Sequence, residues 1–177
     1  MRACRLFVQN NLNRDFVGTR GFSVAFTRDG IERTIAAFPF LEGYVRRVLR
    51  DDCNAFYLNP LQLENGSRVD PHIDRSLRSY CKDIVMPFSV TVLYVEVPNG
   101  MVGGELVLAR GKKTLARIRP RRNLLVEFDG DLTHSVERVD SPGRRLSLVC
   151  EQYALTEDEL EQVPAYAVES RAGYPRS

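Results

Sequence analysis

Several short segments of the chain have the apolar and polar pattern of strands. Alternation with a period of two is typical of strands with one buried face, and turn-forming residues separate such runs. The clearest runs are residues 134–139 and 144–150, and shorter ones occupy residues 4–8 and 22–26. This pattern predicts strands in these four places.

Residues 29–51 follow a different, helical period. Their apolar residues are Ile31, Ile35 and Phe38 before Pro39, and Leu41, Val45, Val48 and Leu49 after it. Because proline interrupts a helix, we expect two helices that pack on one sheet as core support. Thr156 is followed by three acidic residues, which is typical of a helix cap, so a short helix to about residue 163 is also expected.

No repeat, low-complexity tract or linker divides the 177 residues, so we expect a single domain. Its core is expected over about residues 55–155, with supporting strands and helices in residues 1–54 and a helix and tail in residues 156–177. A chain of this length buries roughly 70% of its extended surface on folding, which is enough for a sizeable core. The tail after residue 164 is expected either to be loose or to fold over the site.

Charge and cysteine content exclude several classes of protein. The net charge is only +2, and the basic run at residues 117–122 has no interleaved aromatic residues for base stacking, so nucleic-acid binding is disfavoured. The four cysteines form no C-x-x-C pair, so neither structural zinc nor a disulfide framework is expected. No apolar run is long enough for a signal peptide or a membrane span. We therefore expect a cytoplasmic protein without a membrane anchor.

The chain has only two histidines, and both lie in informative places. His72 comes two residues before Asp74, and His134 follows about sixty positions later. If residues 71–74 are extended, the side chains of His72 and Asp74 share one face and converge. Two imidazoles and one carboxylate bind iron(II) on one face and leave other coordination positions open. These three residues are therefore candidate metal ligands.

The residues after His134 predict a β-hairpin. Residues 134–139 alternate, residues 140–143 are turn formers, and the strand pattern resumes at Arg144. In the register set by a four-residue loop, Arg145 shares a face with His134, Arg138 also points inward, and Arg144 points away. Four strand residues span about 13 Å, so Arg145 is expected to pair with the far end of a short dicarboxylate chelated to the metal.

Taken together, His72-x-Asp74, His134 and Gly143-x-Arg145-x-Ser147 resemble the iron(II)- and 2-oxoglutarate-dependent dioxygenases, in particular the prolyl 4-hydroxylase-like branch. Residues 90–95, 103–108 and 119–128 are similar to successive core strands of that family, and the resemblance runs in order over residues 61–153. It implies a double-stranded β-helix, a cupin-like jelly roll, with flanking helices.

The resemblance also implies cofactors and roles. The cofactors are Fe(II), 2-oxoglutarate and O2, with ascorbate as the reductant. The residues given roles are His72, Asp74 and His134 for the metal, and Arg145, Ser147, Tyr94 and Gln62 for 2-oxoglutarate. Gln62 stands where many relatives have a tyrosine, ten residues before the first histidine.

The implied activity is hydroxylation of an unactivated carbon, with decarboxylation of 2-oxoglutarate to succinate. The expected substrate is an amino acid, a peptide or a protein side chain, and Asp74 favours hydroxylation because related halogenases have a small residue there. The loop over residues 75–87 leaves the metal-binding strand and is expected to pass near the open coordination positions. The candidate substrate contacts are Arg75, Arg78, Tyr80 and Arg138.

Other functions stay open at this point. An oxygenase of the same family could act on a non-peptide small metabolite, and a metal-binding jelly-roll module could lack turnover. A divalent-metal hydrolase could use two histidines and an aspartate around zinc, but Arg145 and the Gly-Gly-Glu-Leu strand then have no purpose. A purely structural role for the histidines leaves unexplained why the only two occupy these two places.

Overall fold

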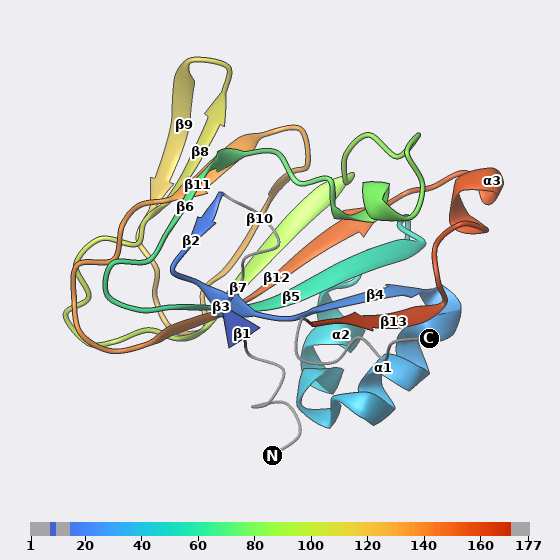
Figure 1. Ribbon diagram of the computed structural model, residues 1–177, viewed down its shortest axis with the longest axis horizontal. Coiled ribbons are helices and arrows are strands. Elements are labelled where there is room, and N and C mark those ends of the chain that lie inside the picture. Colours follow the sequence, from blue (N-terminus) through green and yellow to red (C-terminus); the bar gives the residue numbers. More distant parts are fainter. Residues whose placement is uncertain (1–7, 10–14, 171–177) are drawn as a thin grey trace.

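The computed structural model describes residues 8–9 and 15–170 and is mainly β, with two antiparallel sheets and a few short helices (Figure 1). The larger sheet has eight strands: β1 (Val8–Gln9), β3 (Arg20–Gly21), β4 (Ser23–Thr27), β5 (Ala55–Leu63), β7 (Ser89–Glu96), β10 (Leu125–Asp129), β12 (Arg145–Tyr153) and β13 (Tyr166–Glu169). The smaller sheet has five: β2 (Phe16–Val17), β6 (Arg68–His72), β8 (Leu106–Arg110), β9 (Lys113–Ile118) and β11 (Thr133–Val136).

From β5 onward the chain passes back and forth between the two sheets. It runs from β5 in the larger sheet to β6 in the smaller one, returns to β7, makes the β8–β9 hairpin in the smaller sheet, and then places β10, β11 and β12 in alternate sheets. Two facing sheets built in this way form a jelly roll, in which inward residues of both sheets share one interior. The predicted fold class is confirmed.

Two helices support the larger sheet on the side away from the smaller one (Figure 1). They are α1 (Ile31–Ala37) and α2 (Glu42–Val48), and Pro39 begins the short 3-10 turn η3 (Pro39–Leu41) between them. Their apolar residues pack with those on one face of the sheet in a single cluster, which includes Ile35, Phe38, Leu41, Val45, Phe26, Phe56, Leu58 and Leu148. Burial of each such side chain contributes about 1.5–3 kcal/mol, so the helices fix the sheet on which the interior is built.

The ends of the chain agree in part with the sequence-based expectations. The strand expected at residues 22–26 is β4, whereas most of the segment 4–8 lies outside the described residues. The capping box of Thr156 and Glu159 is present, but its helix α3 (Glu157–Leu160) is shorter than expected. The described part of the tail forms β13, which pairs with β4 at the edge of the larger sheet. No helix in the described ranges is long and apolar enough to cross a membrane.

The predicted hairpin between residues 134–139 and 144–150 is wrong. β11 pairs with β6 and β8 in the smaller sheet, whereas β12 pairs with β5 and β7 in the larger one. The turn-forming residues 140–143 therefore connect two sheets instead of two neighbouring strands. The predicted sides are nevertheless correct for the two arginines, since Arg145 is buried and Arg144 is exposed and ion-paired with Glu96.

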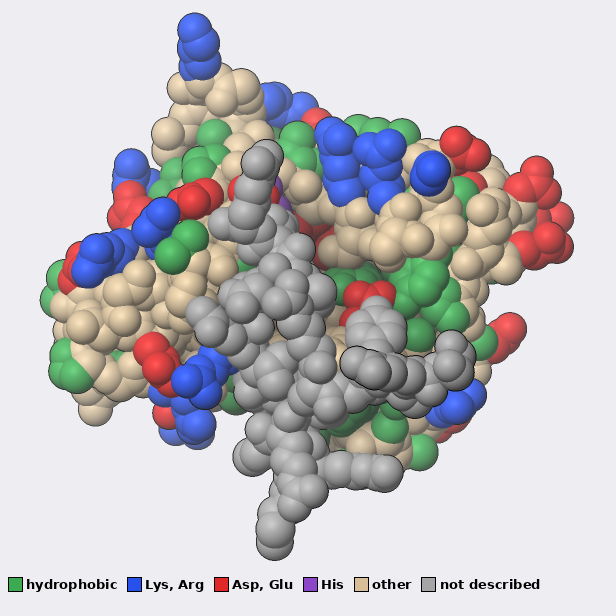
Figure 2. Space-filling model, in the orientation of Figure 1, with side chains coloured by type: hydrophobic (Ala, Val, Ile, Leu, Met, Phe, Trp, Pro, Cys, Tyr) green, Lys and Arg blue, Asp and Glu red, His purple; other side chains and the backbone are tan. Residues whose placement is uncertain are grey.

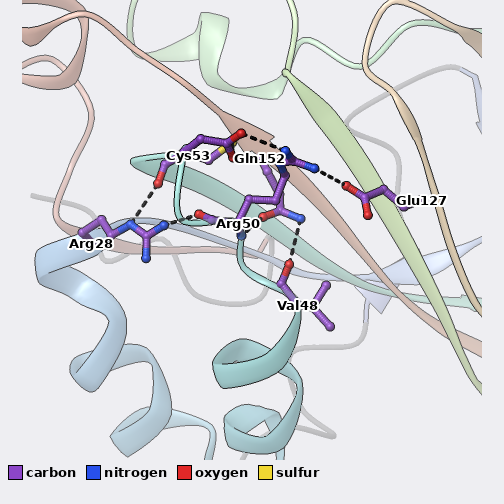
Figure 3. A network of polar contacts seen from close by, with 7 residues as sticks. Arg28, Val48, Arg50, Cys53, Glu127 and Gln152 are labelled. Carbon is purple, nitrogen blue, oxygen red and sulfur yellow. Dashed lines mark hydrogen bonds and ion pairs between the residues drawn. The ribbon is translucent and has the colours of Figure 1, made fainter.

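A polar network fastens the end of α2 to the larger sheet (Figure 3). The fully buried Gln152 accepts a hydrogen bond of 2.8 Å from the backbone N–H of Arg50 and donates one of 3.2 Å to the carbonyl of Val48. The guanidinium of Arg50 also pairs with Glu127 of β10 at 2.9 Å. Arg28 donates to the Arg50 carbonyl from the other side. The network holds the turn after α2 against β12.

We expect Gln152→Ala to lower the free energy of unfolding by about 1–3 kcal/mol, because it leaves a backbone donor and a backbone acceptor without partners inside the protein. Urea unfolding followed by circular dichroism measures this loss. The matched control is Gln162→Ala, which removes an exposed amide that bonds only within the α3 turn. Equal stability of the two variants would contradict the structural role of this network.

Candidate metal centre and cavity

The three candidate ligands lie together in the structure, although His134 is about sixty residues from the other two in the sequence. His72 is the last residue of β6 and lies directly opposite His134 of β11 in the antiparallel ladder. Asp74 follows two residues after His72. One ligand atom of each residue lies within 4.8 Å of those of the other two, as a shared metal ion requires.

Backbone carbonyl groups fix the orientation of both imidazoles. Nδ1 of His72 lies 2.8 Å from the carbonyl oxygen of Asp70, and Nδ1 of His134 lies 3.3 Å from that of Leu132. A carbonyl only accepts hydrogen bonds, so Nδ1 carries the proton in each ring and Nε2 presents a lone pair. Both Nε2 atoms point to the carboxylate of Asp74, each at 3.3 Å from one of its oxygens.

The charge state of this cluster suits a cation. Burial alone disfavours an ionised carboxylate, yet the two imidazoles hold the pKa of Asp74 well below its ordinary value. Burial likewise disfavours imidazolium at His72, but the facing carboxylate raises the pKa of that ring. Aromatic rings close the sides of the cluster, since Phe16 lies 5.3 Å from the His72 ring and Phe128 lies 5.1 Å from the His134 ring. A metal ion at Nε2 would replace the proton that this carboxylate favours, so the cluster offers one carboxylate and two imidazoles in an apolar surround.

A cavity of about 260 Å³ lies between the two sheets, and the three ligands form part of its wall. On β12, every second residue from Arg145 to Glu151 also faces it. These residues are Arg145, Ser147, Val149 and Glu151. Alternation along one strand therefore places an arginine, a hydroxyl, an apolar side chain and a carboxyl in a row.

Arg145 is a buried cation at one end of this row, with only 2% of its surface exposed. Its Nη1 donates a hydrogen bond of 2.9 Å to the Gly104 carbonyl, and its guanidinium carbon lies 4.8 Å from the centre of the Tyr94 ring. Burial lowers the pKa of Arg145. Gly104 has φ +74°, a backbone conformation that favours glycine over residues with a Cβ. No carboxylate of the described residues pairs with Arg145, which leaves room for an external anion.

Several polar atoms around the cavity have no hydrogen-bond partner. In the described part of the chain, seven buried side-chain polar atoms make no hydrogen bond, and four of them are His72 Nε2, Asp74 Oδ2, Tyr94 OH and Arg145 Nε. Buried polar atoms without a partner are costly and uncommon in native proteins. Their concentration here fits a site that takes a metal ion at His72, Asp74 and His134 and an anion at Arg145.

Two more residues were predicted to contact 2-oxoglutarate. Ser147 is fully buried, faces the cavity beside Arg145, and has its Oγ 3.5 Å from the Leu61 carbonyl oxygen. Gln62 is placed contrary to the prediction: it faces away from the cavity, where its amide donates to Glu64 at 2.6 Å. The spacing from His72 located the strand but not its inward face, which carries Leu61 instead.

The four predicted substrate contacts separate into two groups. Arg75 lines the cavity, whereas Arg78 is exposed and Tyr80 is turned to Glu169. Arg138 is also placed contrary to the prediction, because its side chain is 62% exposed and pairs with Asp140 at 2.9 Å. The prediction that Arg138 points inward assumes a hairpin between residues 134–139 and 144–150, and the two segments lie in different sheets.

Sequence reasoning missed Glu151, a buried acid at the other end of the cavity from Arg145. Its carboxyl group accepts hydrogen bonds from the backbone N–H of Ser76 at 3.1 Å, from Ser76 Oγ at 2.5 Å and from the hydroxyl of Tyr153. Burial, with the nearby charge of Asp74, raises the pKa of Glu151 to about 8. The alternation along β12, in which every second residue after Arg145 and Ser147 faces inward, predicts the inward side of Glu151.

The loop over residues 75–87 is anchored at two points beside the cavity. Ser76, in the 3-10 turn η4 (Ser76–Ser79), is bound to Glu151 of β12 as described above. The hydroxyl of Tyr80 donates to Glu169 of β13, and the hydroxyl of Tyr57, which lines the cavity, donates to the same carboxylate at 2.6 Å. The loop is therefore held at a fixed place over the cavity.

No protein-family model and no curated protein matches this chain. Solved structures do match. A prolyl-4-hydroxylase from Pseudomonas putida is 17% identical over 85% of this chain and 78% of that one, with a TM-score of 0.54. A prolyl hydroxylase from Trichoplax adhaerens, in complex with a peptide fragment of the hypoxia inducible factor oxygen degradation domain, is 17% identical over 87% and 72% of the two chains, with a TM-score of 0.51.

An oxidoreductase of the 2OG-Fe(II) oxygenase family from Burkholderia pseudomallei is 14% identical over 78% of this chain and 67% of that one, with a TM-score of 0.50. At such low sequence identity, the structural similarity establishes the fold alone. The chain therefore has the jelly-roll fold of 2OG-Fe(II) oxygenase structures, prolyl hydroxylases among them.

Proposed function

We propose that this protein is an iron(II)- and 2-oxoglutarate-dependent dioxygenase that hydroxylates an unactivated carbon of an amino acid, a peptide or a protein side chain. One observation carries the proposal: a buried cluster of two oriented imidazoles and a carboxylate shares a cavity with a buried, unpaired arginine. The fold that the chain shares with 2OG-Fe(II) oxygenase structures supports it.

The donor set suits iron(II). His72 and His134 offer Nε2 and Asp74 offers a carboxylate oxygen, so these three residues would hold the ion from one side and leave the cavity side open. A zinc hydrolase would also use such a set, but it has no need of an arginine buried at the far end of the same cavity. Arg145 therefore favours the oxygenase over the hydrolase.

Arg145 suits 2-oxoglutarate because a guanidinium pairs with a carboxylate through two parallel hydrogen bonds. Its buried Nε makes no hydrogen bond within the protein. Ser147 lines the cavity beside it, and Tyr94, the cross-strand partner of Ser147, has the centre of its ring 4.8 Å from the guanidinium carbon. A dicarboxylate held there by one end would present its other end to the metal. Pairing with a carboxylate would also remove the cost of burying the cation alone.

Iron(II) and 2-oxoglutarate, when bound, supply the oxidation of a C–H bond by O2, with release of succinate and CO2. The residues of this chain bind and orient. The carbonyls of Asp70 and Leu132 keep both Nε2 atoms aimed at one point, and Arg145 sets the direction of the cosubstrate. Apolar side chains that line the cavity, such as Val92 and Leu106, exclude water from the reacting centre.

The cytoplasm is the proposed location. Cys53, Cys81 and Cys150 are buried and free, as is usual for proteins of a reducing compartment. The peptide bound in the Trichoplax adhaerens structure supports a peptide or an amino acid as the class of substrate.

The proposal is tested by incubating the purified protein with iron(II), ascorbate and 2-oxoglutarate and measuring succinate. We expect succinate formation that depends on 2-oxoglutarate and iron and that candidate substrates stimulate. His134→Ala is the control, since it removes one ligand from the cluster. Equal succinate from both proteins, with candidate substrates present, would refute the proposed activity.

Asp74→Ala is expected to weaken iron binding by more than about 100-fold, because two imidazoles alone make a weak site. Loss of a residue that only hydrogen-bonds to a metal ligand typically costs about 10- to 100-fold, and loss of a ligand should cost more. Metal content after anaerobic loading and gel filtration measures this. Asp70→Ala is the matched control, because only the backbone carbonyl of Asp70 holds His72. Normal iron content in Asp74→Ala would show that Asp74 is not a ligand.

Arg145→Ala is expected to raise the KM for 2-oxoglutarate by about 30-fold or more, the effect of about 2 kcal/mol or more for a lost buried charge pair. Arg144→Ala, one residue earlier on the exposed face, should change it by less than about threefold. Initial rates of succinate release at varied 2-oxoglutarate give both values. A larger effect at Arg144 would overturn the assignment.

A further inference from the structure

The two charged residues on the inward face of β12 stand at opposite ends of the cavity. Arg145 and Glu151 are six residues apart on one strand, roughly 20 Å along its axis, and both line the same space. Glu151 lies near the metal ligands, because it binds both the backbone N–H and the hydroxyl of Ser76, two residues after Asp74, and both acids line the same cavity. A molecule bound at Glu151 would therefore lie beside the metal ligands, on the side away from Arg145.

Glu151 has the features of a carboxylate that awaits a cation. It is only 4% exposed, and no lysine, arginine or histidine of the described residues forms an ion pair with it. A carboxylate has about four acceptor positions, and three are used: two on Oε2, by the Ser76 N–H and the Tyr153 hydroxyl, and one on Oε1, by Ser76 Oγ. One acceptor position on Oε1 is thus left. Without a cation, burial keeps this group largely protonated at neutral pH, since its pKa is raised to about 8. A bound cation would favour the ionised form, because buried charges are stable when they are paired.

The mouth of the cavity carries the opposite charge. Arg75 lines the cavity, is exposed, and forms no ion pair with any residue in the described ranges. Arg78 and Lys82 follow on the same loop, and Figure 2 shows basic side chains gathered over this part of the molecule. Although Arg75 is next to Ser76, which binds Glu151, its guanidinium does not pair with that carboxyl group. Adjacent parts of the wall thus present a separate negative and positive group.

We infer that the substrate is a free amino acid whose ammonium group binds Glu151 and whose carboxylate binds Arg75. This inference rests on the proposed oxygenase function and names the substrate class of the same site. A cavity of about 260 Å³ is at the small end for ligand sites, and 2-oxoglutarate takes part of it, which favours a small molecule over a peptide. Within a peptide the same nitrogen is an uncharged amide, which gives Glu151 no countercharge.

The ligand's charges are tested first, on the wild-type protein loaded with iron(II) and 2-oxoglutarate. Each of the twenty common amino acids is offered in three forms: free, N-acetylated and with the carboxylate converted to an amide. Binding is measured by anaerobic calorimetry and turnover by succinate release. We expect at least one free amino acid to bind and to stimulate turnover, N-acetylation to weaken its binding at least tenfold, and amidation to weaken it less.

Two variants assign the contacts. Glu151→Gln keeps the shape and an acceptor for Ser76 but removes the charge, so it should weaken binding of the free amino acid at least tenfold while iron content and 2-oxoglutarate affinity stay at wild-type values. Arg75→Gln should abolish the difference between the free acid and its amide. Glu161→Gln, at an exposed glutamate remote from the cavity lining, is the control and should change none of these values.

Three results would overturn the inference. The first is that no free amino acid binds. The second is that Glu151→Gln and wild type bind the amino acid ligand with equal affinity. The third is that Glu151→Gln also loses iron and 2-oxoglutarate binding, which would show that the carboxyl group only positions the loop. Each is distinct from failure of the proposed function. If wild type still turns over 2-oxoglutarate with iron, the oxygenase stands and only the substrate class falls.

Discussion

The interaction on which the rest of the site depends is the burial of the Asp74 carboxylate between two imidazoles whose Nε2 atoms face it. The backbone around each histidine sets the position of its ring. The β6–β11 ladder sets His72 opposite His134, and the backbone carbonyls of Asp70 on β6 and Leu132 just before β11 hold the Nδ1 atoms. The donor set is thus preorganised by the smaller sheet, which reduces the cost of assembling it around a metal ion.

The larger sheet contributes charged side chains of the cavity that would select its ligands. One strand, β12, carries both the cation at Arg145 and the acid at Glu151, while its opposite face packs on α1 and α2 through residues such as Leu148. Unpaired buried charges and hydroxyls lower stability, and they gather around one cavity while the helix-covered face is apolar. This division is typical of proteins in which a rigid support compensates for a polar functional site.

Much of this arrangement could be predicted from local pattern, because periodicity fixes which way a side chain faces. It gave the two helices around Pro39, the convergence of His72 and Asp74, and the inward side of Arg145. Periodicity does not fix the partner of a strand. The local pattern of residues 140–143 fits a hairpin turn, yet these residues connect two sheets, and the predicted inward side of Arg138 depends on that hairpin. The spacing from His72 predicts a role for Gln62 but does not say which face of β5 its side chain lies on. Glu151 obeys the same alternation as Arg145, but its burial depends on a loop whose contacts are not local.

The most direct measurement is a crystal structure of the protein loaded anaerobically with manganese(II), as a redox-stable substitute for iron(II), and with 2-oxoglutarate, with the metal located by anomalous diffraction. We expect one metal ion bound directly to Nε2 of His72, Nε2 of His134 and one oxygen of Asp74, with 2-oxoglutarate extending from the metal to a paired Arg145. A metal bound elsewhere, or an Arg145 that remains unpaired beside a fully loaded metal, would contradict it.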